Sequence, residues 1–399
     1  MSREIIVQKF GGTSLSTAEA RKKAAGKVAA ALSRGFKTVV VVSAMGRKGD
    51  PYATDTFLSL VGDNLPKRER DLLLSCGEII SAAVMVKNLK ELGWQAVALT
   101  GQQAGIITEG DFGETHISEI RPQRVIEEIK TNRVPVIAGF QGVTPDGEIT
   151  TLGRGGSDIT ASILAAKLKA HHLEIYTDVN GLMTADPRVV PDAKTLNKAD
   201  YEELCELAFQ GAKVMHPRAA EIARRKKVPL RICSTFSQDE GTWVGEKEET
   251  GELVTGIATK KDIVFVKILP RLQQESASGL KVFRLLGEAG ISVDMINVQA
   301  PSISFIIGKK DCKDLSSLLD ENDYKYNLCN DYCKLTLVGA GMTGVPGVMG
   351  KITEALQSEA IPIFQATDSL TSIACLIKER DEARAVRLLH DTFSLEEVK

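Results

Sequence analysis

The carboxyl-terminal part of the chain contains an internal repeat, and this feature constrains the fold more than any other. Ala289–Val293 matches Glu359–Ile363 at an offset of 70 residues (361 − 291). Each copy has the order strand, glycine, amphipathic helix, strand, strand, helix, which is typical of a ferredoxin-like βαββαβ unit. Units of this size usually pair to cover the open edges of their sheets. The sequence therefore predicts two small units, at residues 263–330 and 331–399, that pair within the chain or across a dimer.

The amino-terminal part of the chain alternates apolar runs with longer amphipathic segments. The runs typical of buried strands are Ile5–Val7, Thr38–Val42, Gln95–Leu99, Val134–Phe140 and Leu173–Thr177. Segments with helical spacing lie between them, and this alternation predicts an α/β domain with a largely parallel central sheet. The charged, glycine-flanked stretch Gly245–Gly251 predicts a boundary, so the domain is expected at residues 1–245.

Composition excludes several classes of protein. The 399 residues include 50 Lys+Arg and 52 Asp+Glu, and this near balance argues against a nucleic-acid partner. Every apolar run is shorter than the roughly 18 residues of a membrane span, and charges interrupt the amino terminus where a signal peptide needs an apolar core. The seven cysteines are scattered, which is typical of proteins from a reducing compartment. We therefore expect a soluble, cytoplasmic protein with no membrane partner.

Two glycine-rich turns precede predicted helices and are suited to binding anions. In Lys9–Ser14, two adjacent glycines let backbone N–H groups approach a phosphate, and Lys9 adds a positive charge. In Leu152–Asp158, Arg154 lies among three glycines, where it can hold a carboxylate through two hydrogen bonds. Alone, the first turn could equally be structural, and Arg154 could pair with Asp158. Together the turns predict a phosphoryl donor and an anionic acceptor in one domain.

Two further segments place polar residues where open α/β sheets bind ligands. Tyr176–Arg188 follows a predicted strand end and contains Asp178 and an Asp-Pro-Arg sequence. Gln210–Arg218 contains Lys213, which alone would be read as a surface lysine and is considered functional only together with the other candidate segments. We interpret both segments as candidate parts of the same site.

Other nucleotide and metal signatures are absent or out of context. Gly339–Gly344 fits the dinucleotide pattern G-x-G-x-x-G, but Phe364 stands about 20 positions on, where that fold needs an acidic residue. The Walker A pattern G-x-x-x-x-G-K-[ST] does not occur, and the histidines and cysteines lack metal-ligand spacing. We therefore expect a phosphate site of another type, and no metal ligands are assigned.

The motifs taken together, in their order along the chain, resemble the motif series of the aspartokinases. The matching segments are Lys9–Ser14, Val42–Gly46, Ser75–Glu78, Leu152–Asp158, Thr177–Val179 and Thr184–Arg188. The repeat resembles the two regulatory ACT domains of that family. The resemblance implies an α/β fold: an amino-acid-kinase-type three-layer αβα sandwich with a mainly parallel sheet, followed by two ACT units. Within the family, the chain is most similar to the single-function, diaminopimelate-sensitive bacterial type.

The resemblance implies that the γ-phosphoryl group of ATP passes to the β-carboxylate of L-aspartate, with Mg²⁺ as the metal, to give 4-phospho-L-aspartate. This is the first step towards lysine, diaminopimelate, threonine and methionine. Lys9 and Lys213 are expected to flank the phosphoryl group, with Asp158 holding them in place. The implied ATP-binding residues are Lys9, Phe10, Gly11, Gly12, Thr177, Asp178, Met183, Thr184, Ala185, Asp186, Pro187, Arg188 and Lys213. The implied substrate-binding residues are Thr13, Ser14, Ser43, Thr54, Glu78, Arg154 and Ser157.

The paired ACT units imply feedback inhibition by an amino acid, which is lysine, threonine or meso-diaminopimelate. The candidate effector residues are Val293, Asp294, Ile361 and Gln365. The resemblance also implies a homodimer or a larger homo-oligomer formed through these units. One departure from the family leaves the effector open: the first repeat has Ala277–Gly279 where many relatives have Pro-Gly.

Two alternative functions stay open. One is a related amino-acid kinase that acts on N-acetylglutamate or glutamate. Glu78 argues against an acylated substrate, because a buried carboxylate facing a neutral amide would lack a counter-charge. The other alternative is an amino-acid sensor that has lost kinase activity, although every implied catalytic side chain is present.

Overall fold

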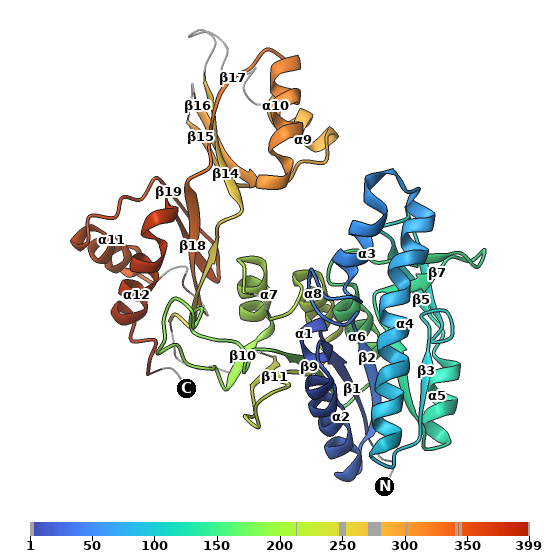
Figure 1. The fold of residues 1–399 in the computed structure, drawn as a ribbon. Helices are drawn as coiled ribbons and strands as arrows, with labels where there is room; N and C mark the ends of the chain where they lie inside the picture. The colour runs from blue at the N-terminus through green and yellow to red at the C-terminus, as the bar shows by residue number, and fades with distance from the viewer. Residues whose placement is uncertain are drawn as a thin grey trace.

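The computed structural model describes residues 4–212, 214–246, 253–269, 281–299, 302–339, 342 and 345–397. Lys213, most of the predicted boundary stretch and Ala277–Gly279 lie outside the described residues. In Figure 1 the amino-terminal domain, coloured blue to green, lies beside two smaller units coloured orange and red. These are called the first and second repeat units below.

An eight-stranded sheet forms the centre of the amino-terminal domain, in the order β10-β12-β11-β9-β1-β2-β6-β3. Neighbouring strands are parallel except for the antiparallel pair β11 and β12, so the prediction of a mainly parallel sheet is confirmed. The strands are β1 (Ile5–Phe10), β2 (Lys37–Val42), β3 (Ala96–Leu99), β6 (Val134–Ala138), β9 (His172–Thr177), β10 (Lys198–Asp200), β11 (Leu230–Ser234) and β12 (Thr242–Gly245).

Helices cover both faces of this sheet and complete the expected three-layer sandwich. Successive side chains of a strand point to opposite faces, so in β2 Val39 and Val41 join one core cluster while Val40 and Val42 join another. This burial on two sides explains why β2 is a continuous valine run. The first cluster packs beneath α5 (Gln123–Lys130), α6 (Gly156–Lys167), α7 (Tyr201–Phe209) and α8 (Pro217–Lys226). The second packs beneath α1 (Gly12–Leu15), α2 (Ala18–Ser33) and α4 (Lys67–Glu91).

A smaller sheet, in the order β5-β4-β7-β8, leads into the second glycine-rich turn. Its strands are β4 (Ile106–Glu109), β5 (His116–Ile120), β7 (Gln141–Val143) and β8 (Ile149–Thr151), and α3 (Thr54–Val61) and η1 (Gly62–Asn64) complete the domain. Helix α4 is long and apolar enough to cross a membrane by length and composition alone. Half of its most apolar window is buried, however, because the helix packs against the main sheet.

The first repeat unit has the expected βαββαβ order. Its sheet has the order β15-β16-β14-β17, with the two middle strands both antiparallel to their neighbours. The elements are β14 (Ile263–Leu269), α9 (Lys281–Glu288), β15 (Val293–Gln299), β16 (Ser302–Gly308), η2 (Lys309–Asp311), α10 (Cys312–Glu321) and β17 (Lys325–Cys329).

The second repeat unit differs from the prediction in the source of one strand. After its last helix the described chain forms no fourth strand, and the sheet order is instead β13-β18-β20-β19. Strand β13 precedes the first repeat unit and pairs with β18 in antiparallel register, so the expected range 331–399 misses it. The pairing covers the edge of β18 and buries Ile257. The elements are β13 (Gly256–Lys260), β18 (Tyr332–Val338), α11 (Val348–Ser358), β19 (Gln365–Asp368), β20 (Ser372–Lys378), η3 (Glu379–Asp381) and α12 (Glu382–Thr392).

The second repeat unit also packs directly on the amino-terminal domain. The Thr336 hydroxyl donates to Gln210 Oε1 at 3.3 Å, and the Ser372 hydroxyl donates to Glu206 Oε1 at 2.8 Å. These bonds attach β18 and β20 to the carboxyl end of α7. The first repeat unit therefore enters the chain as an insertion between β13 and β18 of a unit that is already docked.

Candidate active site

The first glycine-rich turn lies at the carboxyl end of β1 and is packed against the end of β2. A Cβ atom on Gly12 would lie 2.5 Å from the carbonyl oxygen of Gly46 and 2.9 Å from that of Ala44. The Gly46 N–H donates to the Gly12 carbonyl at 2.9 Å. Only glycine fits at position 12, because both obstructing atoms belong to the backbone. The turn is therefore packed tightly against the loop after β2, and its role in binding a phosphate stays a prediction.

Lys9 and Asp158 form a nearly buried ion pair beside this turn. Lys9 Nζ lies 2.6 Å from Asp158 Oδ1, and each side chain is only 11% exposed. The other carboxylate oxygen accepts the backbone N–H of His216 at 3.1 Å. Asp158 thus fixes the ammonium group of Lys9 at the end of β1. The structure brings these two predicted residues together, while Lys213 lies outside the described residues.

The second glycine-rich turn sets the start of α6. Gly153 and Gly155 have φ angles of +71° and +73°, a conformation that costs little only for glycine. A side chain at Gly155 would also meet the ring of His216. Arg154 between them is exposed, and within the described part of the chain it has no ion pair or hydrogen bond. Its guanidinium group is therefore available to a ligand.

Glu78 of α4 is a buried carboxylate with one unused oxygen. It is 3% exposed, Oε1 accepts the Ala44 N–H at 2.9 Å, and Oε2 has no hydrogen-bond partner among the described residues. Burial raises the pKa of Glu78 to about 8, although the hydrogen bond from Ala44 opposes the shift. The contact also joins two predicted motifs, since Ala44 follows β2. A cationic group placed at Oε2 would satisfy the side chain and restore its negative charge.

The other predicted substrate-binding residues differ in how far their side chains are buried. Ser157 is buried, and Thr13, Ser43 and Thr54 are partly buried. Ser14 does not fit the expectation of a substrate contact, because it is fully buried and its hydroxyl bonds within the protein. That hydroxyl accepts from Thr235 at 2.7 Å and donates to the Tyr176 carbonyl at 3.4 Å.

A cavity of about 660 Å³ lies beyond the carboxyl end of β9 and is lined by several of the predicted nucleotide residues. The predicted residues that line it are Asp178, Met183, Ala185, Asp186, Pro187 and Arg188. Ala212 and Val214, the neighbours of Lys213, line it as well. Phe10 does not, because its ring is fully buried and stacks on Tyr176 with ring centres 4.7 Å apart.

The second repeat unit forms part of the wall of this cavity, which the sequence does not predict. Ile257, Ala258 and Thr259 of β13 and Val386 of α12 line it. No local pattern in the sequence marks these residues, because their position depends on the docking of the two domains. The cavity therefore has one wall from each domain.

Thr184 links the two walls. It is fully buried, so its side chain does not face the cavity, although Met183 and Ala185 on either side of it do. Its carbonyl accepts the Ile257 N–H at 2.8 Å, and its hydroxyl lies 3.0 Å from His390 Nε2 of α12. A displacement of the second repeat unit would therefore move a residue of the cavity loop.

The cavity carboxylates do not form a set of metal ligands. Asp178 pairs with Arg47 at 2.5 Å, and Asp186 pairs with Arg188 at 2.6 Å. Mg²⁺ is usually held by one or two carboxylates together with the phosphates of the nucleotide. Both carboxylates pair with arginines in this structure, so their present geometry identifies no ligand. We assign no protein ligand to Mg²⁺.

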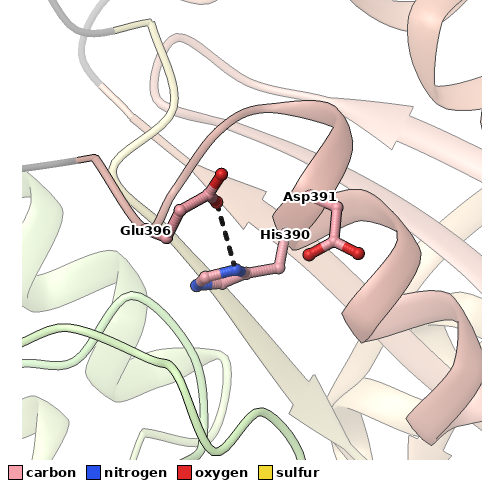
Figure 2. A group of neighbouring side chains, drawn as sticks. All are labelled: His390, Asp391 and Glu396. Carbon is pink, nitrogen blue, oxygen red and sulfur yellow. Dashed lines mark ion pairs between the residues drawn. The ribbon is translucent and has the colours of Figure 1, made fainter.

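One group of possible metal ligands does come together among the described residues, at the end of α12. Figure 2 shows His390, Asp391 and Glu396, whose ligand atoms lie within 4.8 Å of one another. His390 is buried and its Nε2 faces Thr184, while both carboxylates are exposed. Because Mg²⁺ prefers oxygen ligands and phosphates, this group does not fit the metal of phosphoryl transfer.

The candidate effector residues lie in the two repeat units, and two of them bond across from one unit to the other. Asp294 of β15 pairs with the buried Lys334 of β18 at 2.6 Å. Gln365 of β19 accepts the Ser304 hydroxyl at 3.0 Å and donates to the Met295 carbonyl. Val293, which precedes Asp294, is partly buried, and Ile361, four residues before Gln365, is buried. Their role in effector binding stays a prediction.

The Gly12 contact predicts a sharp difference between two glycine substitutions. Gly12→Ala should weaken the binding of ADP about tenfold or more and destabilise the fold by about 1–3 kcal/mol, because backbone atoms must move. The control is Gly26→Ala in α2, where a Cβ meets nothing within 4 Å. It should stabilise the protein by about 0.5–1 kcal/mol and leave binding unchanged. Calorimetric titration and urea unfolding measure both effects, and equal behaviour of the two variants would contradict the packing argument.

Comparisons with known proteins agree with this geometry. The amino acid kinase family matches residues 4–234, and an ACT domain matches residues 329–391. Aspartokinase 1 of Bacillus subtilis (strain 168) is 45% identical over 402 residues, covering 98% of this chain and 99% of that protein. Aspartokinase of Geobacillus stearothermophilus is 39% identical, covering 98% of each chain.

Solved structures give the same result. Escherichia coli aspartokinase III in complex with aspartate and ADP (R-state) superposes with a TM-score of 0.82 at 25% identity, covering 98% of this chain and 99% of that chain. The same enzyme in complex with lysine and aspartate (T-state) gives a TM-score of 0.77 at 26% identity, with the same coverage. With the motifs in order and both domain types matched, the chain belongs to the amino acid kinase family and, within it, to the aspartokinases.

Proposed function

We propose that this protein is an aspartate kinase that transfers the γ-phosphoryl group of ATP to the β-carboxylate of L-aspartate. One arrangement supports this above all: the Lys9–Asp158 pair stands beside the glycine turn, and two neighbouring elements bond to that turn. Glu78 accepts the N–H of Ala44, whose carbonyl packs on Gly12, and the cavity residue Asp178 follows Tyr176, whose carbonyl accepts the Gly11 N–H. A donor nucleotide on one side and an amino acid on the other would present their reacting groups at Lys9.

The chemistry needs alignment and charge compensation rather than a base. The β-carboxylate of aspartate is ionised at neutral pH, so it is already a nucleophile. Two anions must be brought in line, and the charge on the transferred phosphoryl group must be stabilised by fixed donors. Lys9 and the N–H group of Gly12 supply such donors, whereas the Gly11 N–H already donates to the Tyr176 carbonyl at 3.2 Å. Lys213 would add a second positive charge, since its neighbours line the cavity.

The acceptor side has two groups of opposite charge for the two ends of an amino acid. Arg154 is exposed and without a partner among the described residues, so it can clamp the α-carboxylate in bidentate geometry. Glu78 Oε2 is unpaired and can accept the α-ammonium group. A substrate with an acylated nitrogen would leave that carboxylate without a counter-charge, which argues against N-acetylglutamate.

We further propose that the second repeat unit transmits feedback inhibition to the nucleotide cavity. Its strand β13 and helix α12 line that cavity, and both bond to Thr184. An amino acid bound at the repeat units would act by favouring a docking in which this wall is displaced. We also propose that the effector is that of the diaminopimelate-sensitive type and that the protein forms a homodimer through the repeat units. A cytoplasmic location completes the proposal, since all seven cysteines are free.

The assay that tests the proposed activity traps the acyl phosphate as a hydroxamate, with ATP and Mg²⁺ present. We expect product from L-aspartate and little from glutamate or N-acetylglutamate. Lys9→Ala and Arg154→Ala should abolish the activity while circular dichroism shows an intact fold. Preference for N-acetylglutamate would point to the related kinase, and no product from any acceptor would point to a sensor.

The raised pKa of Glu78 predicts a pH-dependent affinity for aspartate. Below about pH 8 the empty site contains mostly the neutral carboxyl group, because burial disfavours the charged form. The ionised fraction that pairs with the substrate ammonium group then falls about tenfold for each pH unit below that value. We therefore expect kcat/KM for aspartate to rise from pH 6 to pH 8. Glu78→Gln should give a higher KM and a flat profile, whereas a flat profile in the unmodified enzyme would exclude this role.

The contact between His390 and Thr184 predicts that α12 influences nucleotide binding. His390→Phe keeps a ring but removes one hydrogen bond, so KM for ATP should rise by up to about tenfold and inhibition by the effector should weaken. Inhibition assays with lysine, threonine and meso-diaminopimelate, singly and in pairs, identify that effector. The control is Arg384→Ala on the same helix, whose partners Asp381 and Glu359 belong to its own unit. If both variants keep normal kinetics and inhibition, the contact between His390 and Thr184 does not transmit the inhibition to the cavity.

A further inference from the structure

Arg47 is a charged residue of the cavity wall that lies outside the family motifs. It follows the motif Val42–Gly46 directly, is 69% exposed, and its Nη2 lies 2.5 Å from Asp178 Oδ2. Both residues line the cavity. Their partnership connects the loop after β2 with the loop after β9, which are 131 positions apart in the chain.

The backbone of Arg47 is fixed beside the glycine turn. The preceding residue, Gly46, donates its N–H to the Gly12 carbonyl at 2.9 Å. The Arg47 N–H donates to Asp50 Oδ2 at 2.7 Å, and the Asp50 N–H donates back to the Arg47 carbonyl at 2.8 Å. Thr56 of α3 closes the turn by donating its hydroxyl to the Asp50 carbonyl at 2.7 Å. The side chain therefore starts from a rigid turn.

The position of the side chain matters for any triphosphate. Arg47 begins next to Gly12 and ends at Asp178, so it spans the interval between the glycine turn and the cavity. A nucleotide with its nucleoside in the cavity and its terminal phosphoryl group at Gly11 and Gly12 must cross this interval. The phosphate chain would then run alongside the guanidinium group.

The present partner of Arg47 is easily replaced. Ion pairs between exposed side chains contribute only about 0–1 kcal/mol, and Asp178 is itself 40% exposed. A guanidinium group binds phosphate oxygens through two parallel hydrogen bonds, and such charge-assisted bonds are stronger than neutral ones. The other arginine of the described cavity wall, Arg188, is held by Asp186 through both carboxylate oxygens. Arg47 is thus the more readily exchanged of these two cations.

We propose that Arg47 is a ligand of the nucleotide's phosphate chain, which Asp178 holds in place until the nucleotide enters. This inference rests on the proposed function for the identity of the donor as an adenine nucleotide. On binding, the guanidinium group exchanges the Asp178 carboxylate for phosphate oxygens. Because the turn at Gly46 is bonded to the glycine turn, this contact also sets the distance from the phosphates to Lys9.

Binding measurements on four variants test the proposal without requiring catalysis. Calorimetry with the full-length protein gives affinities for ADP and for the imido analogue of ATP in Arg47→Ala, Arg47→Lys, Asp178→Asn and the double variant Arg47→Ala/Asp178→Asn. Arg47→Ala should weaken both ligands about tenfold or more, and Arg47→Lys should recover part of the loss. The decisive comparison is the effect of Arg47→Ala in the Asp178→Asn background, where it should remain as large.

The alternative is that Arg47 acts only by pairing with Asp178. In that case Asp178→Asn reproduces the loss, and removing Arg47 from the Asp178→Asn variant costs nothing further, which would overturn the proposal. The matched control is Lys48→Ala, which removes the same charge from the same turn but does not line the cavity. A tenfold loss in that variant would show a general charge effect instead. If the unmodified protein binds neither nucleotide, the proposed function has failed, whereas binding with equal affinities in all variants rejects Arg47 alone.

In the catalytic assay, the same proposal predicts a specific kinetic pattern. Arg47→Ala should raise KM for ATP while KM for aspartate stays within about twofold, because the acceptor groups Arg154 and Glu78 come from other elements. A rise in both constants would indicate a general disturbance of the turn rather than a lost phosphate contact.

Discussion

The ion pair between Lys9 and Asp158 is the interaction on which the rest of the site depends. It joins the end of the central strand β1 to the first turn of α6, and both side chains are only 11% exposed. Removing one partner of such a pair leaves the other charge uncompensated in buried surroundings, which costs roughly 3–5 kcal/mol. The His216 N–H on the second carboxylate oxygen extends the same anchor to the start of α8. The Asp158 carboxylate therefore fixes the ammonium group of Lys9 and links β1, α6 and the start of α8.

The sequence predicts those features that depend on local pattern. The valine run at 39–42 identifies a strand buried on both faces, and the two glycine-rich segments mark turns in which Gly12, Gly155 and Gly156 have no room for a side chain. Other features depend on partners far away in the chain. Gly256–Lys260 is too short to be assigned without β18, and nothing local to Arg47 indicates that it meets Asp178. Ser14 looks like a hydroxyl donor to a ligand, but the first turn of α1 directs it towards Thr235 inside the protein.

The nucleotide cavity differs from the glycine turn in how it is built. The turn belongs to one domain and is held by backbone contacts such as that between Gly12 and Gly46. The cavity has a wall from each domain. The second wall is attached by hydrogen bonds to Thr184, Val189, Glu206 and Gln210 and by an apolar cluster that includes Ala185 and Val190. In the proposed function, phosphoryl transfer therefore takes place within one domain, whereas the nucleotide binds at the boundary between two domains.

The first repeat unit is inserted between two neighbouring strands, β13 and β18, of the second repeat unit. Lys260 lies opposite Lys334 in the antiparallel pair of β13 and β18, so a chain without the insertion could close these strands with a simple hairpin. The inserted unit is therefore joined to the second repeat unit by two adjacent chain segments, and it also packs on that unit through an apolar cluster that includes Phe265, Met295, Tyr332 and Leu376. Because one of these segments continues directly from β13, a displacement of the inserted unit would be transmitted to the strand that lines the cavity.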